Sequence, residues 1–385
     1  MSSPSPARRR QLRTWSPSPD GSGLLPVSAT DQSDEAPRSL VDLASNDYLN
    51  LAQHPEVIAA ATKEIHLSGV GAGGSRLVSG SRPVHDQLEQ KLAHWLNRDR
   101  VLLYPSGFQA NLAAVLALAD RHTPVLADRL CHHSLLTGVQ ASGARLQRFA
   151  HNDLNDLNRK LERCRDRQPE HQPLVITESL FSMEGTSPNL SAMAELCSSH
   201  AARLLVDEAH ALGVLGDGGR GLCHSLPTRA VTMLSGTFGK AFGSGGAFLA
   251  CDADLGETLL QTSGAFRYTT ALAPPLAAAA LAALTLMQRH PDWSEGLMAT
   301  SQEWRSALAA AGWERPGGTG PILPLVIGPD QAALDRQQTL EAAGLLSIAI
   351  RPPTVPEGTA RLRLVVRRLL PDGTLEALLH ALSLG

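Results

Sequence analysis

A single lysine, Lys240, stands among glycines and apolar residues in the segment TFGKAFGSGG, residues 237–246. Glycines allow the backbone to approach a ligand closely, and few surface lysines have such neighbours. Desolvation lowers the pKa of an amine, which helps the amine to form a Schiff base with a carbonyl compound. A lysine that only closes a loop is the alternative. The segment therefore indicates carbonyl chemistry at Lys240 without deciding it.

A carboxylate, Asp207, ends the apolar run LLVD at residues 204–207, and His210 follows three positions later. A carboxylate at such a position can keep a pyridinium nitrogen protonated, which makes a pyridoxal ring an electron sink. Taken alone, Asp207 is more simply explained as the cap of the next turn. Its combination with the glycine-flanked Lys240 downstream favours cofactor chemistry.

Two other segments carry polar groups that a cofactor could use. Ser106 and Gly107 precede a long apolar helix, whose free N–H groups could bind an anion, although this segment taken alone is better explained by an ordinary serine N-cap. His132 and His133 follow a predicted strand. Either imidazole could stack on a planar cofactor, and their chemistry favours neither.

Apolar runs alternate with helical patterns along most of the chain. We expect strands at residues 40–43, 100–104, 125–128, 146–149, 174–178, 204–207, 232–235, 246–250, 322–327 and 361–366. We expect helices at residues 55–67, 85–96, 107–119, 275–290, 331–343 and 374–384. Continuous apolar strands separated by helices predict an α/β fold, with a mostly parallel central sheet covered on both faces. Functional groups of such a sheet lie at the carboxyl ends of its strands.

Local composition and the order of predicted elements divide the sequence into three parts. Residues 1–40 are rich in Ser, Pro and Arg and read as an N-terminal arm. Residues 41–275 would form the large cofactor-binding domain. Residues 276–385, after a linking Ala/Leu helix, would form a smaller α+β domain.

Composition excludes several classes of protein. The 385 residues are 43% hydrophobic and 18% charged, as in an ordinary globular enzyme, and the formal net charge of −3 supplies no basic field for nucleic acid. The five cysteines are spread singly, so we expect no metal site and no disulfide framework. The N-terminus lacks a secretory pattern, and the most apolar stretch, residues 272–287, is too short to span a membrane. We therefore expect a cytoplasmic protein without membrane partners.

A series of motifs resembles one family. SNDYLNLAQHP, GAGGSRLVSGSRPVHDQLE, SGFQAN, RFAHND, TESLFSMEG, VDEAHALGVLG, TFGKAFG and GTARLRL occur in this order. Together they resemble the α-oxoamine synthases, which are pyridoxal 5'-phosphate (PLP) enzymes of fold type I. The similarity runs from about Leu40 to the end of the chain. GGSRLVSGSRPVH, RFAHND and RPPTVPEGTARLRL are most similar to the branch that acts in biotin biosynthesis.

The resemblance implies a role for particular residues. Lys240 would form the Schiff base, Asp207 would pair with the pyridinium nitrogen, and His210 would bond the phenolic oxygen of the ring. His132, the first of the pair, aligns with the histidine that stacks on the ring. Further expected cofactor contacts are Gly107, Phe108, Ser182, Thr237 and, from a neighbouring subunit, Thr269, with Thr270 as its rival. Expected substrate contacts are Arg363 for the amino-acid carboxylate, with Arg361 as its rival, and Arg13 and Thr354 for the acyl group.

The implied reaction is a decarboxylating condensation of L-alanine with a pimeloyl thioester, carried by acyl carrier protein or by CoA, in a homodimer. The nearest alternative is another α-oxoamine synthase that uses glycine or serine with a different thioester. A nucleotide-binding module is a more distant alternative, but no GxxxxGK[ST] occurs, and no GxGxxG opens a helix after a strand. One departure from the family is Asn50, which stands where a glycine is usual; asparagine tolerates positive φ, so the turn can persist.

Overall fold

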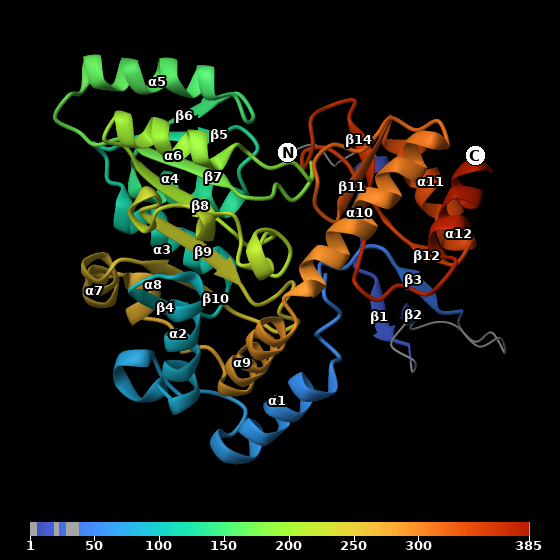
Figure 1. Ribbon diagram of the computed structural model, residues 1–385, viewed down its shortest axis with the longest axis horizontal. Coiled ribbons are helices and arrows are strands. Elements are labelled where there is room, and N and C mark those ends of the chain that lie inside the picture. Colours follow the sequence, from blue (N-terminus) through green and yellow to red (C-terminus); the bar gives the residue numbers. More distant parts are fainter. Residues whose placement is uncertain (1–5, 19–22, 28–37, 385) are drawn as a thin grey trace. The chain divides into compact units, whose positions relative to one another are not determined.

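The computed structural model describes residues 6–18, 23–27 and 38–384. The chain forms two compact units, and each is described by itself (Figure 1). The larger unit comprises residues 49–182 and 187–295, and the smaller comprises residues 1–48, 183–186 and 296–385. The sequence-based division at residues 40 and 275 stays a prediction about domains.

A seven-stranded sheet forms the centre of the larger unit. Its strands are β4 (Arg100–Tyr104), β5 (Pro124–Asp128), β6 (Arg145–Phe149), β7 (Leu174–Glu178), β8 (Arg203–Asp207), β9 (Met233–Thr237) and β10 (Ala247–Cys251). They are ordered β4-β10-β9-β8-β7-β5-β6, and only β10 runs antiparallel to its neighbours. The predicted mostly parallel sheet is confirmed. It brings the carboxyl ends of β5, β7, β8 and β9 to one edge.

Helices cover both faces of this sheet, as the sequence predicts (Figure 1). The helices of the larger unit are α1 (Pro55–Ser68), α2 (Pro83–Leu96), α3 (Gly107–Leu118), α4 (His133–Ser142), α5 (Leu154–Arg167), α6 (Leu190–Ser199), α7 (Ala253–Thr262), α8 (Gly264–Arg267) and α9 (Pro274–Arg289), and α1 packs on α9. One face packs on α3, α4, α7 and α8 through a cluster that includes Val115, Leu135, Leu259 and Phe266. Helices α2, α5 and α6 contact strands as well. The sheet is therefore buried, which explains its continuous apolar strands.

The smaller unit combines segments from the two ends of the chain. Its elements are η1 (Pro6–Arg8), β1 (Thr14–Pro17), β2 (Gly23–Val27), β3 (Leu40–Asp42), β11 (Ile322–Gly328), α11 (Asp330–Ala342), β12 (Leu345–Leu346), β13 (Ile348–Ile350), β14 (Ala360–Val365) and α12 (Thr374–Ser383). Helix α10 (Asp292–Ala310) begins in the larger unit. The strands form two sheets, β1-β2-β3-β12 and β11-β14-β13. The expected α+β character is present.

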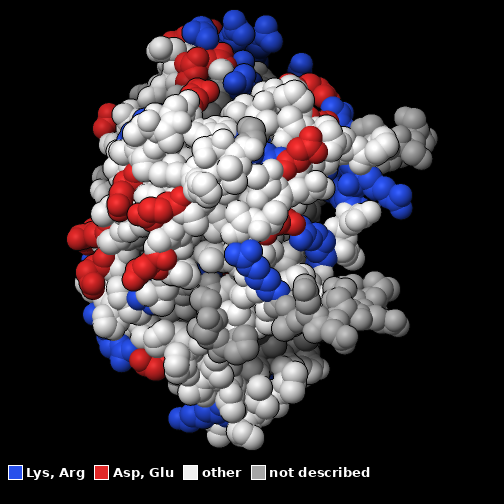
Figure 2. Space-filling model, turned by 90° about the vertical axis from the view of Figure 1, so that its right-hand side faces the viewer, with Lys and Arg blue, Asp and Glu red and all other residues white. Residues whose placement is uncertain are grey.

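The structure also bears on the turn at Asn50, on the surface charge and on the length of the apolar helices. Asn50 has a φ of 57°, so asparagine does adopt the left-handed backbone at the turn where the family has glycine. Acidic and basic side chains both occur across the face drawn in Figure 2, without one continuous basic field. No helix among the described residues is long and apolar enough to cross a membrane.

Candidate active site

Three parallel strands of the larger unit end in polar residues at the same edge of the sheet. Strand β7 ends at Glu178, β8 at Asp207 and β9 at Thr237. Glu178 lies opposite Asp207 in register, and Asp207 lies opposite Ser235. Because the strands are parallel, this edge collects the side chains on which the sequence-based hypothesis depends.

Asp207 is a buried carboxylate whose hydrogen-bond donors are neutral. Only 6% of the residue is exposed. Its Oδ1 accepts a hydrogen bond from the backbone N–H of Ala209 at 2.8 Å, and its Oδ2 accepts one from Nδ2 of Asn111 at 2.7 Å. Among the described residues, no cationic side chain lies within 4.0 Å to form an ion pair with it. A buried carboxylate of this kind is suited to a ligand with a positively charged N–H group.

His132 lies next to this carboxylate, at the N-cap of α4. Its backbone N–H donates to Oε1 of Glu178 at 2.6 Å, which ties the loop to the end of β7. Burial of the ring lowers the pKa of His132; the negative charge of Asp207 opposes this shift, and the positive charge of Lys240 adds to it. Both charged groups therefore act on the His132 ring through electrostatics. His133 is the first residue of α4, one position further along.

Lys240 lies in the tight turn that follows β9. The backbone N–H of Gly243 donates to the carbonyl of Lys240 at 2.8 Å. Gly243 has a φ of 60°, and a Cβ atom there would collide with the backbone of Ala52. Only glycine fits this position, so the glycines beside Lys240 shape the turn that carries it. His210 lies three residues beyond Asp207 and is buried.

An anion cradle lies at the N-terminus of α3. Oγ of Ser106 accepts a hydrogen bond from the N–H of Gln109 at 3.3 Å, while Gly107 and Phe108 are the first two residues of the helix. A Cβ atom built on Gly107 would lie 3.8 Å from Oγ1 of Thr237, so the helix begins beside the end of β9. N–H groups at a helix start next to a hydroxyl are suited to a phosphate.

Ser182 and Thr269 occupy loops of the larger unit. Ser182 lies four residues beyond the end of β7 and is half-buried. Thr269 donates to the carbonyl of Thr270 at 3.4 Å. The next residue, Ala271, donates its N–H to the carbonyl of Gly74 at 2.9 Å, which joins this loop to the glycine-rich GAGGSR loop. No hydrogen bond between described residues joins Thr269 to the cradle, so its role stays a prediction.

The two rival arginines of β14 have different partners within the smaller unit. Arg361 forms an ion pair with Glu184 at 3.3 Å and also donates to the carbonyl of Met183. Arg363 donates to the neutral side-chain oxygen of Asn46 at 2.9 Å. It also lies near the hydroxyl of Tyr48, whose pKa burial raises to about 12 against the opposing effect of Arg363. Because Arg361 is already paired with the carboxylate of Glu184, Arg363 is the better candidate for binding a substrate carboxylate.

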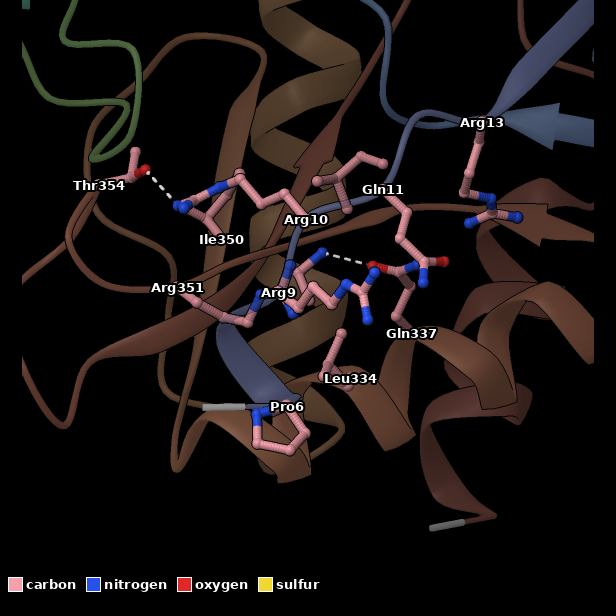
Figure 3. Close-up of a pocket in the computed structure, with 12 residues that line it drawn as sticks. Pro6, Arg9, Arg10, Gln11, Arg13, Leu334, Gln337, Ile350, Arg351 and Thr354 are labelled. Carbon is pink, nitrogen blue, oxygen red and sulfur yellow. Dashed lines mark hydrogen bonds between the residues drawn. The ribbon is translucent and has the colours of Figure 1, made fainter. Parts of the chain in front are cut away.

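A cavity of about 1050 Å³ in the smaller unit is rich in arginine (Figure 3). Its lining includes both expected acyl contacts, Arg13 and Thr354. Both carboxylate oxygens of Glu341 accept from Arg13, at 2.6 and 2.9 Å. Sequence reasoning did not anticipate this ion pair, because Glu341 lies far along the chain on another element.

Three further arginines line the same cavity: Arg9 and Arg10, from an N-terminal basic cluster whose sequence allows either a solvated arm or a substrate contact, and Arg351, which sequence reasoning did not single out. Arg10 donates to Oγ1 of Thr354 at 3.1 Å, and Arg351 donates to the carbonyl of Ala7 at 2.6 Å. The backbone N–H of Arg9 donates to the carbonyl of Pro6 at 3.2 Å, whereas its guanidinium has no hydrogen-bond or ion-pair partner among the described residues. Because none of these three guanidinium groups is paired with a carboxylate in the part of the chain that the structure describes, they are better suited than Arg13 to an incoming anion.

Two buried polar residues beside Asp207, Asn111 and Ser134, also escaped the sequence analysis. Asn111 lies on α3 and Ser134 on α4, and Nδ2 of Asn111 donates to Oγ of Ser134 at 2.9 Å. A signal for Asn111 was present, since this polar residue stands between Ala110 and the apolar run LAAVLAL and is buried on the core side of the helix. Ser134 gave no comparable signal, because serine is common in the first turn of a helix.

A family comparison defines the class to which this fold and site belong. Residues 38–382 match the model of the class I and II aminotransferases. The chain therefore belongs to this family.

Individual relatives show which members of the family this chain is similar to. The 8-amino-7-oxononanoate synthase of Saccharophagus degradans is 41% identical over 348 residues, which are 90% of this chain and 87% of that protein. The 8-amino-7-oxononanoate synthase of Thioalkalivibrio sulfidiphilus is 43% identical, over 90% of this chain and 88% of its own. The resemblance to the α-oxoamine synthases that the motifs predict is confirmed.

Solved structures of related proteins have the same fold. The 8-amino-7-oxononanoate synthase of Francisella tularensis superposes with a TM-score of 0.77 at 27% identity, over 90% of this chain and 96% of its own. A serine palmitoyltransferase of S. paucimobilis, with bound PLP–myriocin aldimine, gives a TM-score of 0.85 at 27% identity, over 89% and 86%. The predicted fold type I architecture is confirmed.

Proposed function

We propose that this protein is a PLP-dependent 8-amino-7-oxononanoate synthase. It condenses L-alanine with a pimeloyl thioester and releases CO2 and the free thiol, as a step of biotin biosynthesis. The observation that carries this proposal is the identity of about 41% across 90% of the chain with proteins of that name. The cluster of Asp207, His132 and Lys240 at one edge of the sheet supports it.

The residues at this edge fit the cofactor on three grounds. Asp207 is a buried carboxylate that no cation pairs with among the described residues, so a protonated ring nitrogen would satisfy it. The start of α3 provides N–H donors for the phosphate, and Thr237, whose hydroxyl donates to the carbonyl of Gly246 at 3.0 Å, lies beside them. His132 would stack on the ring, His210 would bond its phenolic oxygen, and Ser182 would complete the contacts.

When bound, PLP supplies an electron sink for the negative charge that develops at Cα of the amino acid. Lys240 would hold the cofactor covalently and then, once released, take the Cα proton of alanine on Nζ and later return a proton. Asp207 would keep its negative charge beside the ring nitrogen throughout. Its burial makes this interaction strong, because the surroundings screen little of it.

Substrate binding would fall to arginines of the smaller unit. Arg363 would hold the carboxylate of alanine with its planar guanidinium. The arginine-rich cavity would receive the far end of the pimeloyl group, where Arg13 and Thr354 were expected. We assign the binding of its carboxylate to Arg9, Arg10 and Arg351, because Glu341 already neutralises Arg13.

We also propose a cytoplasmic homodimer. Thr269 would reach the phosphate bound in the neighbouring subunit, as the corresponding motif does in the family. Large apolar side chains exposed on the larger unit, among them Leu67, Val70 and Val78, would be buried in an isologous interface.

A second candidate is another α-oxoamine synthase, which would join serine or glycine to a different thioester. Serine palmitoyltransferases superpose with TM-scores up to 0.88, above the 0.77 of the F. tularensis synthase. Their sequence identity of 25–28% is much lower than the 39–43% of the curated synthases, so we rank this candidate second.

Product analysis separates the two candidates. The purified protein, supplied with PLP, is incubated with alanine, glycine or serine in combination with pimeloyl, succinyl, acetyl or palmitoyl thioesters, and the products are identified by mass spectrometry. We expect the fastest reaction with alanine and a pimeloyl thioester. An added methyl in a fitted pocket is worth about 1–3 kcal/mol, so glycine should react slowly rather than not at all. Faster turnover of serine with palmitoyl thioester would contradict the proposal.

A further inference from the structure

Four side chains form a continuous hydrogen-bonded chain from Asp207 to His132. Oδ2 of Asp207 accepts from Nδ2 of Asn111 at 2.7 Å, and the same Nδ2 donates to Oγ of Ser134 at 2.9 Å. Oγ of Ser134 lies 2.7 Å from Nδ1 of His132. The two middle residues are buried, with exposed fractions of 4% for Asn111 and 0% for Ser134.

The donor and the acceptor of each hydrogen bond can be assigned in turn, starting from Asp207. An ionised carboxylate can only accept, so the amide of Asn111 must turn its NH2 group toward Asp207. The second hydrogen of that NH2 group points at Oγ of Ser134, which therefore accepts. The hydroxyl hydrogen of Ser134 is then left to be donated to Nδ1 of His132.

A second contact leads to the same assignment for the ring. The backbone N–H of Ser134 also donates to Nδ1 of His132, at 3.3 Å. A nitrogen that accepts hydrogen bonds carries no hydrogen. The neutral imidazole must then carry its hydrogen on Nε2.

This orientation of the Asn111 amide is energetically unfavourable for one of its atoms, which indicates that a stronger interaction determines it. Its Oδ1 is buried and has no hydrogen-bond partner among the described groups. Turning the amide over would give Oδ1 a donor at Ser134 but would set it against the carboxylate of Asp207. The amide thus keeps the orientation that the charge of Asp207 requires.

We propose that Asn111 and Ser134 are positioning residues that transmit the ionised state of Asp207 to His132, and that they hold its imidazole neutral with the hydrogen on Nε2. The charged groups around the ring are Asp207, Lys240 and His133, with the carboxylate of Glu178 on its backbone N–H. The link to catalysis rests on the proposed function. A protonated imidazole stacked on a ring with a protonated nitrogen would repel it, so a neutral His132 lets Asp207 keep that nitrogen charged.

The ring nitrogens of His132 can be observed directly by NMR on protein labelled with 15N-histidine, without cofactor or substrates. The His132 signals are assigned by their loss in His132→Gln. We expect wild-type protein at pH 8 to show an unprotonated Nδ1 and a protonated Nε2. A protonated Nδ1 in the wild-type protein would overturn the proposal without the need for any further variant.

Variants then test the two positioning residues. In Ser134→Ala and Asn111→Leu we expect a mixture of tautomers and a higher pKa of His132, because the hydroxyl donor to Nδ1 is lost or no longer oriented and only the longer contact from the backbone N–H, at 3.3 Å, remains. Ser134→Thr keeps the hydroxyl and should restore the wild-type signals. Ser142→Ala, which removes a hydroxyl bonded to the carbonyl of Val139 on the same helix, is the matched control. Wild-type ring signals in both Ser134→Ala and Asn111→Leu would overturn the proposal.

Kinetics supply a second readout. We expect kcat to fall about 10-fold to 100-fold in Ser134→Ala, the range found when partners that orient a functional histidine are removed, with little change in the KM for alanine. The limb of the pH profile that reports His132 should move to higher pH. Failure of the wild-type protein to form product would count against the proposed function alone, since the tautomer is measured without substrates.

Discussion

Replacement of Asp207 by asparagine tests the group on which the proposed chemistry depends. The carboxylate accepts one hydrogen bond at each oxygen, from Ala209 and from Asn111. An asparagine offers one oxygen and one NH2 group, so one of these donors would face another donor. Hydrogen bonds to charged groups contribute about 1.5–3 kcal/mol each, and we expect unfolding to become easier by about that amount.

The effect on catalysis should be larger than the effect on stability. A neutral amide does not hold a proton on the ring nitrogen as a carboxylate does. Removal of one preorganised electrostatic partner typically lowers kcat about 100-fold to 1000-fold, and we expect at least the lower figure. The assay is product formation from alanine and a pimeloyl thioester, with absorbance spectra of the protein with PLP recorded in parallel.

A matched control is available in the same fold. Asp252 caps α7 by accepting from the N–H of Leu255, and asparagine is an equally good cap. Asp252→Asn should therefore retain both stability and activity. Near-normal turnover with unchanged spectra in Asp207→Asn would refute the role given to this carboxylate.

Four other predictions can be checked separately. Arg363→Lys should raise the KM for alanine about 10-fold or more through loss of bidentate geometry, while the KM for the thioester stays unchanged. Arg351→Gln should raise the KM for the thioester and leave the KM for alanine unchanged. Equal effects on the two KM values would argue against binding of the acyl group in the arginine-rich cavity. Mixed dimers of Lys240→Ala and Thr269→Ala chains should regain activity that neither parent has, and no recovery in proven heterodimers would show that each site is built from one chain. Burial lowers the pKa of His85, so protons bind the unfolded chain more readily; the free energy of unfolding should fall as pH drops below about 6.5, less steeply in His85→Gln, as denaturant titrations at several pH values would show.

Much of the fold could be predicted from the sequence, because its strands are buried and apolar. The run LLVD identified β8, and its polar last residue marked the functional edge. Helix α4 was missed, since the short stretch from His133 to Ser142 has no clear apolar stripe. Strands β1 and β2 were missed because their pairing depends on contacts with β3 that no local pattern reveals.

The site was predictable where a residue stands at a strand end or in a glycine-rich turn. Asp207 and Lys240 are of this kind. The ion pair of Arg13 with Glu341 and the chain through Ser134 could not be predicted, because they depend on residues far apart in sequence or on side-chain orientation. Such contacts follow from packing, for which periodicity gives no information.

The central claim is that this chain joins alanine to a pimeloyl group and loses the alanine carboxylate in the process. The most direct measurement uses alanine labelled with 13C in its carboxyl group, together with pimeloyl thioester and the protein with PLP. We predict labelled CO2, free thiol and unlabelled 8-amino-7-oxononanoate in equal amounts, and none of them with Lys240→Ala. Label retained in the product, or product formed at the wild-type rate by Lys240→Ala, would contradict the account.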